Sequence, residues 1–172
     1  VVQPNVPCYE DERITAGKMD PTQNVIDLMT QVPATSTYVL MPESALAYLP
    51  RIGSVEESRL SYYAPMLQDI QGDGHANTKL IVGASTRVRY GEVKATDTAH
   101  YYENYGWYDQ FNSALLINSN GETEDIYHKG KLVIGVEAVP LKSLFDTFEV
   151  DLGGVSGQLG WGREHTIFTH QG

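Results

Sequence analysis

The sequence predicts an α/β fold, and three observations lead to that class. Two apolar, β-branched runs, at 37–41 and 79–85, have the length and composition of buried strands. Two stretches, near 25–32 and 60–70, carry apolar residues at helical spacing. The overall composition, with 41% hydrophobic and 20% charged residues, is that of a folded chain. Strands that alternate with helices are typical of the α/β class.

Length and charge limit the possible partners. With 172 residues, the chain fits a single domain spanning 1–172 that can bury a sizeable core. Twelve basic and 22 acidic residues give a net charge of −10, so nucleic acid is a poor partner, because its binding requires clustered Lys and Arg. The chain shows neither a charged leader nor a run of about 18 apolar residues, so we expect it to be soluble as given.

The N-terminal region predicts a short strand at 1–3, then a loop that contains Cys8, the single cysteine. Cys8 is either a nucleophile or a small, partly packed thiol. No histidine stands near it in sequence to act as a base, which favours packing. A helix follows, with Asp20 as N-cap and Pro21 at its first position, and Pro33 ends it.

The strand at 37–41 is ended by Pro42, which cannot donate to a sheet ladder. Glu43 therefore stands at the C-terminal edge of a strand, where open α/β sheets place their chemistry. A solvated glutamate at a strand end is the alternative interpretation. Farther along, Ser54 and Glu57 form a capping-box pattern, which predicts a second helix with a kink or break at Pro65. The strand at 79–85 then extends through 87–90 as an exposed edge.

The segment 91–108 is polar, aromatic and without periodicity, which predicts a structureless, mobile lid or binding loop. Its rings suit the boundary between water and apolar material, such as acyl chains or a lipid headgroup region. Folding of the same rings back onto the domain is the alternative. The rings belong to Tyr101, Tyr102, Tyr105, Trp107 and Tyr108.

A hairpin is predicted from 112–118 and 124–128, joined by a turn that contains Asn120-Gly121. It ends at Lys129, and the apolar run 131–135 then leads to Glu137. A lysine and a glutamate on a short loop after a strand are what an amine–carboxylate catalytic pair requires. We therefore expect the charged ends of Glu43, Lys129 and Glu137 to converge within about 4–6 Å. A short helix is expected at 141–148.

These motifs together resemble the nitrilase (carbon–nitrogen hydrolase) superfamily, and more narrowly its apolipoprotein N-acyltransferase branch. The resemblance runs from Val1 to about Pro140, and more loosely through 151–160. It is carried by three motifs in order, namely Val2-Gln3-Pro4-Asn5, Pro42-Glu43-Ser44, and Tyr127-His128-Lys129-x-Lys131-Leu132-Val133-x-Gly135-x-Glu137-x-x-Pro140.

The resemblance implies a nitrilase-like α-β-β-α sandwich, of which this chain supplies the N-terminal two-thirds. It implies that Glu43 is the general base, that Lys129 stabilises the oxyanion and that Glu137 holds Lys129. The family's nucleophilic cysteine stands on a later strand, which Cys8 does not match, so we expect the chain to end before the nucleophile and to be inactive alone. No cofactor or metal is implied, and the five histidines show no HxH or HExxH spacing.

The implied parent protein lies in the cell inner membrane, held by helices outside this chain, with this domain facing the periplasm. Its implied partners are a phospholipid acyl donor and a lipoprotein whose N-terminal amine accepts the acyl group. Two other classes of function fit the same residues. One is a glycoside hydrolase that uses Glu43 and Glu137 as its carboxylate pair. The other is a non-catalytic ligand-binding domain whose contact surface is the aromatic segment 91–108.

Overall fold

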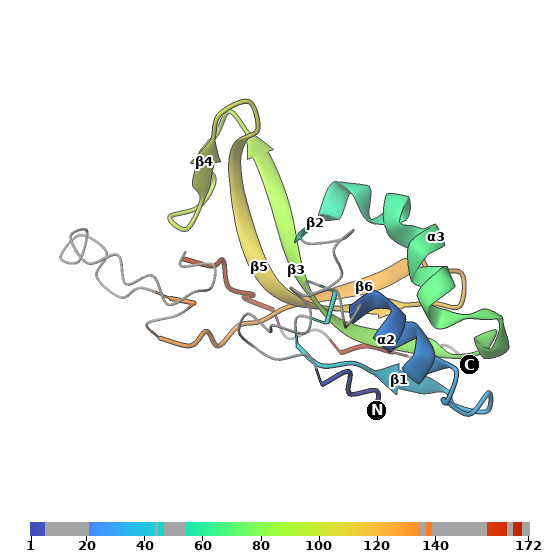
Figure 1. Cartoon of the computed structure of the whole chain (residues 1–172). Coiled ribbons are helices and arrows are strands. Elements are labelled where there is room, and N and C mark those ends of the chain that lie inside the picture. Colours follow the sequence, from blue (N-terminus) through green and yellow to red (C-terminus); the bar gives the residue numbers. More distant parts are fainter. Residues whose placement is uncertain are drawn as a thin grey trace, which may run out of the picture.

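The computed structural model describes residues 1–5, 21–43, 45–46, 54–134, 137–138, 158–164 and 167–169. Within these ranges the chain forms one six-stranded sheet with helices packed on it (Figure 1). Cys8 and the helix expected at 141–148 lie outside the described residues. In chain order the elements are α2 (Pro21–Met29), β1 (Tyr38–Leu40), β2 (Ser54–Glu56), the 3-10 turn η1 (Glu57–Arg59), α3 (Leu60–Gln71), the 3-10 turn η2 (Asp73–His75), β3 (Lys79–Gly91), β4 (His100–Tyr102), β5 (Gly106–Ile117) and β6 (Thr123–His128).

The sheet is organised around β3. Strands β1 and β2 pair with β3 in parallel, and β5 pairs with it antiparallel along nearly its whole length. β4 and β6 each pair antiparallel with β5. This mixed sheet, with helices packed on it, confirms the predicted α/β class.

The core lies between the sheet and the two helices. Leu80 pairs with Ile117 and Val82 pairs with Leu115, so these four side chains share one face of the sheet. All four are almost fully buried. They belong to the same buried cluster as Val25 and Met29 of α2 and Leu67 and Ile70 of α3. Burial of each such side chain is worth roughly 1.5–3 kcal/mol, so this layer fixes the helices to the sheet.

The predicted β5–β6 hairpin is confirmed, and its turn is built on specific local chemistry. The Asn118 side-chain oxygen accepts hydrogen bonds from the backbone N–H groups of Asn120 and Glu122. Gly121 has a φ of +75°, and a Cβ there would lie 2.0 Å from the carbonyl oxygen of Ala64 in α3. Only glycine fits this position, so the turn docks the hairpin directly on α3.

The capping-box prediction at Ser54 is wrong. Ser54–Glu56 forms β2, and α3 begins only at Leu60, after η1. The Ser54 hydroxyl accepts hydrogen bonds from Ser85 and Arg87 instead of from a helix terminus. Pairing with β3 therefore overrides the local signal. The break predicted at Pro65 is also absent, since α3 is assigned as one helix of 12 residues with Pro65 inside it.

The prediction of a structureless segment at 91–108 is wrong in part. Residues 92–99 form no strand, but β3 reaches Gly91, β4 pairs with β5 at 100–102, and β5 begins at Gly106. The hairpin of β3 and β5 rises away from the body of the molecule, with β4 folded against β5 (Figure 1). Its rings pair across strands, with Tyr101 and Trp107 at 5.4 Å between centroids. Aromatic residues favour strands and cross-strand pairs, which explains the order. Beyond Arg87, β3 pairs among the described residues on one side only, with β5, so this end of the strand is an edge as predicted.

No strand forms at 1–3, although the Val2 N–H donates a 2.8 Å hydrogen bond to the carbonyl of Leu40, the last residue of β1. None of the helices among the described residues is both long enough and apolar enough to span a membrane.

Candidate active site

Lys129 stands at a fixed point of the sheet. It follows β6 directly, and its backbone N–H donates a 2.8 Å hydrogen bond to the carbonyl of Asn112 in β5. Its own carbonyl accepts a 3.1 Å hydrogen bond from the N–H of Gly162. The backbone of Lys129 is thus held between β5 and the segment 158–164, which orients the side chain.

The structure brings together the three residues that the sequence singles out. The Lys129 Nζ lies 3.0 Å from Glu137 Oε1 and 3.3 Å from Glu43 Oε1. Glu43 reaches this point from the end of β1, 86 positions earlier in the chain. One ammonium therefore lies between two carboxylates, and the catalytic role of the three residues stays a prediction.

Asn112 is a fourth member that sequence reasoning missed. Its side-chain amide donates to Oε1 of both carboxylates, at 2.5 Å to Glu43 and 2.9 Å to Glu137. Asparagine is disfavoured inside strands, and Asn112 alternates with Gln110 on one face of β5, which was the available signal. Asn112 supplies the cluster with a neutral donor that carries no titrating proton.

Glu137 is a fixed anion. Its Oε1 accepts from Lys129 and Asn112, and its Oε2 accepts a 2.7 Å hydrogen bond from the backbone N–H of Val133. The backbone N–H of Glu137 in turn donates to the carbonyl of Val133, which closes the loop after Lys129 into a turn. With both oxygens bonded and a side chain 12% exposed, Glu137 is built to hold a charge in place.

Glu43 differs from Glu137 in both respects. Its side chain is 60% exposed, and only Oε1 is bonded within the described part of the chain. The preceding Met41 N–H still bonds to Ile81 of β3, so the chain leaves the sheet at Pro42. Glu43 therefore presents one unengaged carboxylate oxygen to solvent beside a fixed cation.

The pKa shifts of Glu137 and Lys129 both favour the charged forms. Burial raises the pKa of Glu137, but hydrogen bonds from Val133, Asn112 and Lys129 together outweigh it, and the net pKa is lowered. Burial lowers the pKa of Lys129, but the hydrogen bond to Glu137 and the nearby charge of Glu43 reverse this, and the net pKa is raised. Lys129 is therefore a cation at neutral pH and suits the stabilisation of an anion.

A second polar network lies on the other face of the sheet, because side chains alternate along a strand. The Ser113 hydroxyl lies 2.9 Å from His128 Nδ1 and 2.8 Å from the Thr86 hydroxyl, and Thr86 donates to Glu57. His128 Nε2 is 3.5 Å from Glu57, which closes the ring. This ring fixes the end of β6 immediately before Lys129.

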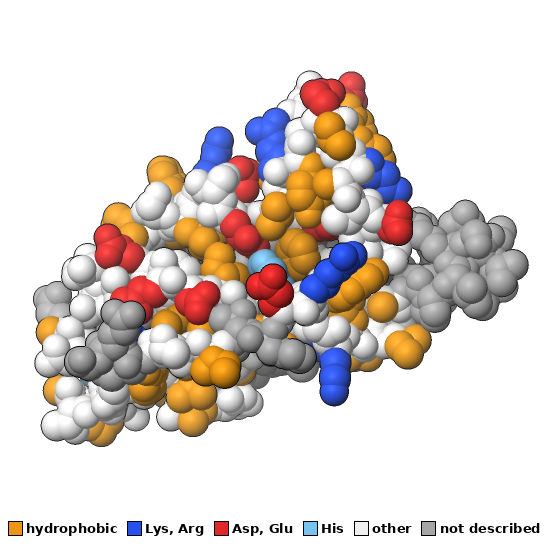
Figure 2. Space-filling model, turned by 180° about the vertical axis from the view of Figure 1, so that it is seen from behind, with side chains coloured by type: hydrophobic (Ala, Val, Ile, Leu, Met, Phe, Trp, Pro, Cys, Tyr) orange, Lys and Arg blue, Asp and Glu red, His pale blue; other side chains and the backbone are white. Residues whose placement is uncertain are grey.

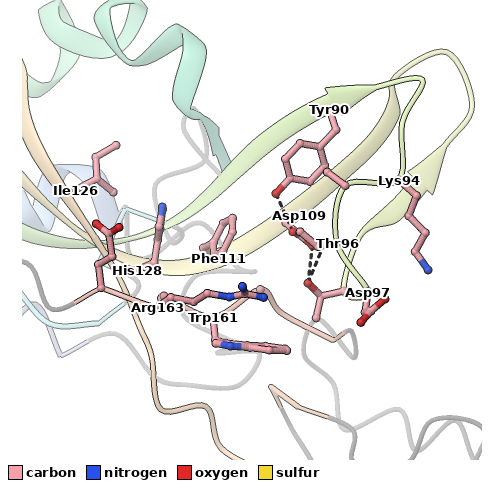
Figure 3. Close-up of a pocket in the computed structure, with 15 residues that line it drawn as sticks. Tyr90, Lys94, Thr96, Asp97, Asp109, Phe111, Ile126, His128, Trp161 and Arg163 are labelled. Carbon is pink, nitrogen blue, oxygen red and sulfur yellow. Dashed lines mark hydrogen bonds between the residues drawn. The ribbon is translucent and has the colours of Figure 1, made fainter.

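The same face carries a hollow of about 770 Å³. At one end, the almost fully buried Asp109 accepts hydrogen bonds from Tyr90, Thr96 and Thr98, and His128 lies toward the other end (Figure 3). Burial, followed by the hydrogen bond to Asp109, raises the pKa of Tyr90 to about 12. Both carboxylate oxygens of Asp109 therefore accept hydrogen bonds from these three hydroxyl groups. No three His, Cys, Asp or Glu side chains of the described ranges could together hold a metal ion.

Charges of both signs are spread over the surface. On the face shown in Figure 2, blue Lys and Arg side chains and red Asp and Glu side chains occur both on the projecting hairpin and on the body of the molecule.

A cation fixed between a buried and an exposed carboxylate, on an α/β sheet, describes a class of site rather than one protein. No protein-family model matches the sequence, and no curated protein matches it. Among solved structures, it is similar to N-terminal amidase with an Asn-Glu-Ala peptide, to the C187S variant of N-terminal amidase, and to N-terminal amidase with a Gln-Val peptide. Each match has a TM-score of 0.37 and 16% identity, and covers 73% of this chain and 26% of the other.

Proposed function

We propose that this chain is part of the catalytic domain of a nitrilase-type enzyme that transfers acyl groups through a covalent thioester. The observation that carries the proposal is the asymmetry of the two carboxylates around Lys129. Glu137 has both oxygens bonded and is largely buried, whereas Glu43 is exposed and, among the described residues, bonded through one oxygen only. One carboxylate is therefore suited to hold the lysine and the other to move a proton.

The chemistry follows from these positions. Glu43 takes the proton of a nucleophilic thiol, and the sulfur attacks the carbonyl carbon of an ester or amide. The carbonyl electron pair moves to oxygen, and Lys129 stabilises the oxyanion. When this intermediate collapses, the bond to the leaving group breaks, and Glu43 returns the proton to that group. An amine or water then repeats the sequence on the thioester and releases the thiol. The nucleophile comes from a cysteine outside these 172 residues.

The finer proposal is that the parent protein is an apolipoprotein N-acyltransferase, of which 1–172 is the N-terminal two-thirds of the domain. Its acyl donor is a phospholipid and its acceptor is the N-terminal amine of a lipoprotein. Helices outside this chain place the domain on the periplasmic side of the inner membrane. The support is the order and spacing of the motifs around Glu43, Lys129 and Glu137, together with exposed aromatic side chains on the projecting hairpin, such as Tyr101 and Tyr102.

The two other functions fit the geometry less well. A glycoside hydrolase needs room for a sugar or a water between its carboxylates. Here an ammonium and the Asn112 amide fill that position and bind both groups. A purely ligand-binding domain gives no reason for a buried glutamate to hold a lysine beside an exposed glutamate.

The test uses the full-length protein and an acyl ester, with the covalent acyl adduct measured by mass spectrometry. We expect Glu43→Gln to lower the rate of adduct formation by about 10²–10⁴-fold and Lys129→Met to lower it by about 10²–10³-fold. Lys131→Met, two positions along, is the matched control and should react as the wild type. Equal rates for Lys129→Met and Lys131→Met would refute the proposal.

The isolated chain offers a complementary test of the nucleophile. Incubation with an activated thioester should give no stoichiometric adduct, and Cys8→Ser should change nothing. An adduct on Cys8 that disappears on Glu43→Ala would instead make Cys8 the nucleophile and would contradict our assignment.

A further inference from the structure

We propose that Arg87 and Arg89 form an anchor for an anionic group of the substrate, a phosphate or a carboxylate, on the same face of the sheet as the Lys129 cluster. The proposal rests on the proposed function, because it concerns what that cluster acts on. It starts from strand register. Asn112 pairs with Ser85, Gln110 with Arg87, and Tyr108 with Arg89. Paired residues and every second residue along a strand share a face.

Hydrogen bonds confirm this placement of Arg87. The Arg87 Nε donates 2.9 Å to the Ser54 hydroxyl, and Ser85 donates to the same hydroxyl. Gln110 donates to Ser85, whose register partner is Asn112. A continuous polar track therefore runs along β3 and β5 from the Lys129 cluster to Arg87.

Spacing along the strand gives the distance. Arg87 pairs with Gln110, two positions from Asn112 along β5, and Arg89 pairs with Tyr108, four positions from Asn112. At about 3.3–3.4 Å per residue, the two arginines stand about 7 and 13 Å along the sheet from Asn112. An anionic group bound by the two arginines lies about 7–13 Å along the sheet from Asn112. A small substrate can span that distance from the reacting carbonyl to its anionic group.

The Nε of each arginine donates a hydrogen bond that holds the side chain in place. Arg89 Nε donates 2.7 Å to the carbonyl of Tyr105, and its guanidinium lies 5.0 Å from the Tyr105 ring. The Arg87 guanidinium lies 5.9 Å from the Tyr108 ring. Among the described residues, the terminal nitrogens of both arginines have no hydrogen-bond partner and no carboxylate pairs with either. Each therefore presents the outer fork that binds carboxylate or phosphate through two parallel hydrogen bonds.

Glu56 does not occupy these forks. It is the register partner of Arg87, but its two oxygens accept from Ser58 and from the Tyr105 hydroxyl. Two fixed guanidinium groups beside each other stand out in a chain with a net charge of −10. Such a local site draws in anions that the rest of the surface repels.

The experiment measures probe binding by calorimetry on the 172-residue chain, without catalysis. The probes are inorganic phosphate, a dihexanoyl phosphodiester lipid, hexanoyl-glutamate and uncharged dihexanoylglycerol. We expect the double variant Arg87→Gln/Arg89→Gln to bind the preferred anionic probe at least tenfold more weakly than the wild type. Arg59→Gln, which removes one positive charge from η1, and Lys129→Met should bind it nearly as the wild type does. The strongest-binding probe identifies the group as lipid phosphodiester, free phosphate or carboxylate.

Three results would overturn the anchor. Unchanged binding in the double variant is one, and loss of binding in Lys129→Met alone is another, since it would place the anion on the lysine. Equal affinity for dihexanoylglycerol is the third. If the double variant does not fold, Arg87→Lys/Arg89→Lys keeps the charge without the fork and should give an intermediate affinity. In the full-length protein, the arginine variants should still form an adduct with a small uncharged ester, which separates failure of the anchor from failure of the proposed function.

Discussion

At the scale of single residues, environment gives two glutamates different tasks. Glu43 and Glu137 contact the same ammonium and the same amide, yet within the part of the chain that the structure describes only Glu137 also receives a backbone N–H. Asn112 is the residue that joins them. Its effect is electrostatic, because a donor to a carboxylate favours the charged form.

We therefore expect Asn112→Ala to raise the pKa of Glu137, since one of the hydrogen bonds that lower it is lost. The stability supplied by Glu137 is present above its unfolded pKa and is lost as pH falls through its folded pKa. In the variant that loss should begin at a higher pH. Carboxyl NMR titration measures the change, with Gln110→Ala on the same face as control. Identical titrations in Asn112→Ala and wild type would exclude this role.

Tyr90 gives a second prediction, at alkaline pH. Its pKa of about 12 is above the ordinary 10, so its neutral, donating form is favoured in the folded chain. That stability is present below pH 10 and is lost as pH rises toward 12. Tyr90→Phe should flatten this part of the stability–pH curve and remove a late-titrating tyrosine from the ultraviolet titration. Tyr62→Phe, at an 82% exposed position, is the control substitution.

What the sequence could predict at this scale depended on local signals. Glu43, Lys129 and Glu137 each stand beside a proline or a glycine that turns the chain at a strand end. Asn112 lies inside a strand, and its importance arises from contacts with residues 69 and 25 positions away. No local pattern carries that information.

At the scale of elements, turns were predictable and strand partners were not. Asn120-Gly121 indicates a hairpin by its own chemistry. Ser54 and Glu57 have the spacing of a capping box, but Ser54 pairs with Ser85 of β3. A three-residue strand has almost no signal of its own, so the distant partner decides its structure. The aromatic hairpin was mistaken for a loop for the same reason.

The turn at Gly121 can be tested against another glycine. Both Gly121 and Gly72 have φ near +75°, but a Cβ meets the Ala64 carbonyl only at Gly121, and nothing within 4 Å at Gly72. Gly72 has φ +76° and ψ 158°, a conformation almost restricted to glycine, so we expect Gly72→Ala to cost about 1–3 kcal/mol in backbone strain and Gly121→Ala to cost more. Urea unfolding measures both. Equal losses would show that the turn does not dock on α3 as described.

The projecting hairpin should be ordered in solution. Its strand hydrogen bonds and cross-strand ring pairs predict slow amide exchange at 107–110. There β5 pairs with β3 throughout, and its residues 107 and 108 also pair with β4. Protection should far exceed that of the exposed turn at 92–95. Hydrogen exchange measures it, and fast exchange throughout 100–110 would restore the mobile-lid interpretation.

At the scale of the whole molecule, the sheet separates two tasks. Helices and the apolar core stabilise one face, while the Lys129 cluster and the two arginines lie on the other. Composition and periodicity were enough for the α/β class, because burial depends on patterns that repeat along the chain. The cluster also holds the molecule together, since it joins segments near residues 43, 112 and 129–137.

This tie should appear as a coupling free energy between Lys129 and Glu137. In a double-mutant cycle with Lys129→Met and Glu137→Gln, we expect a coupling of about 0.5–3 kcal/mol at pH 7. Both charges are needed, so the coupling should fall as pH drops through the lowered pKa of Glu137 and as pH rises through the raised pKa of Lys129. Lys79 and Glu124, paired at 2.7 Å through a glutamate that is 35% exposed against 12% for Glu137, provide the control cycle, with an expected coupling of about 0.2–1 kcal/mol. A Lys129–Glu137 coupling that persists unchanged at pH 2 would mean that packing, and not charge, links the two residues.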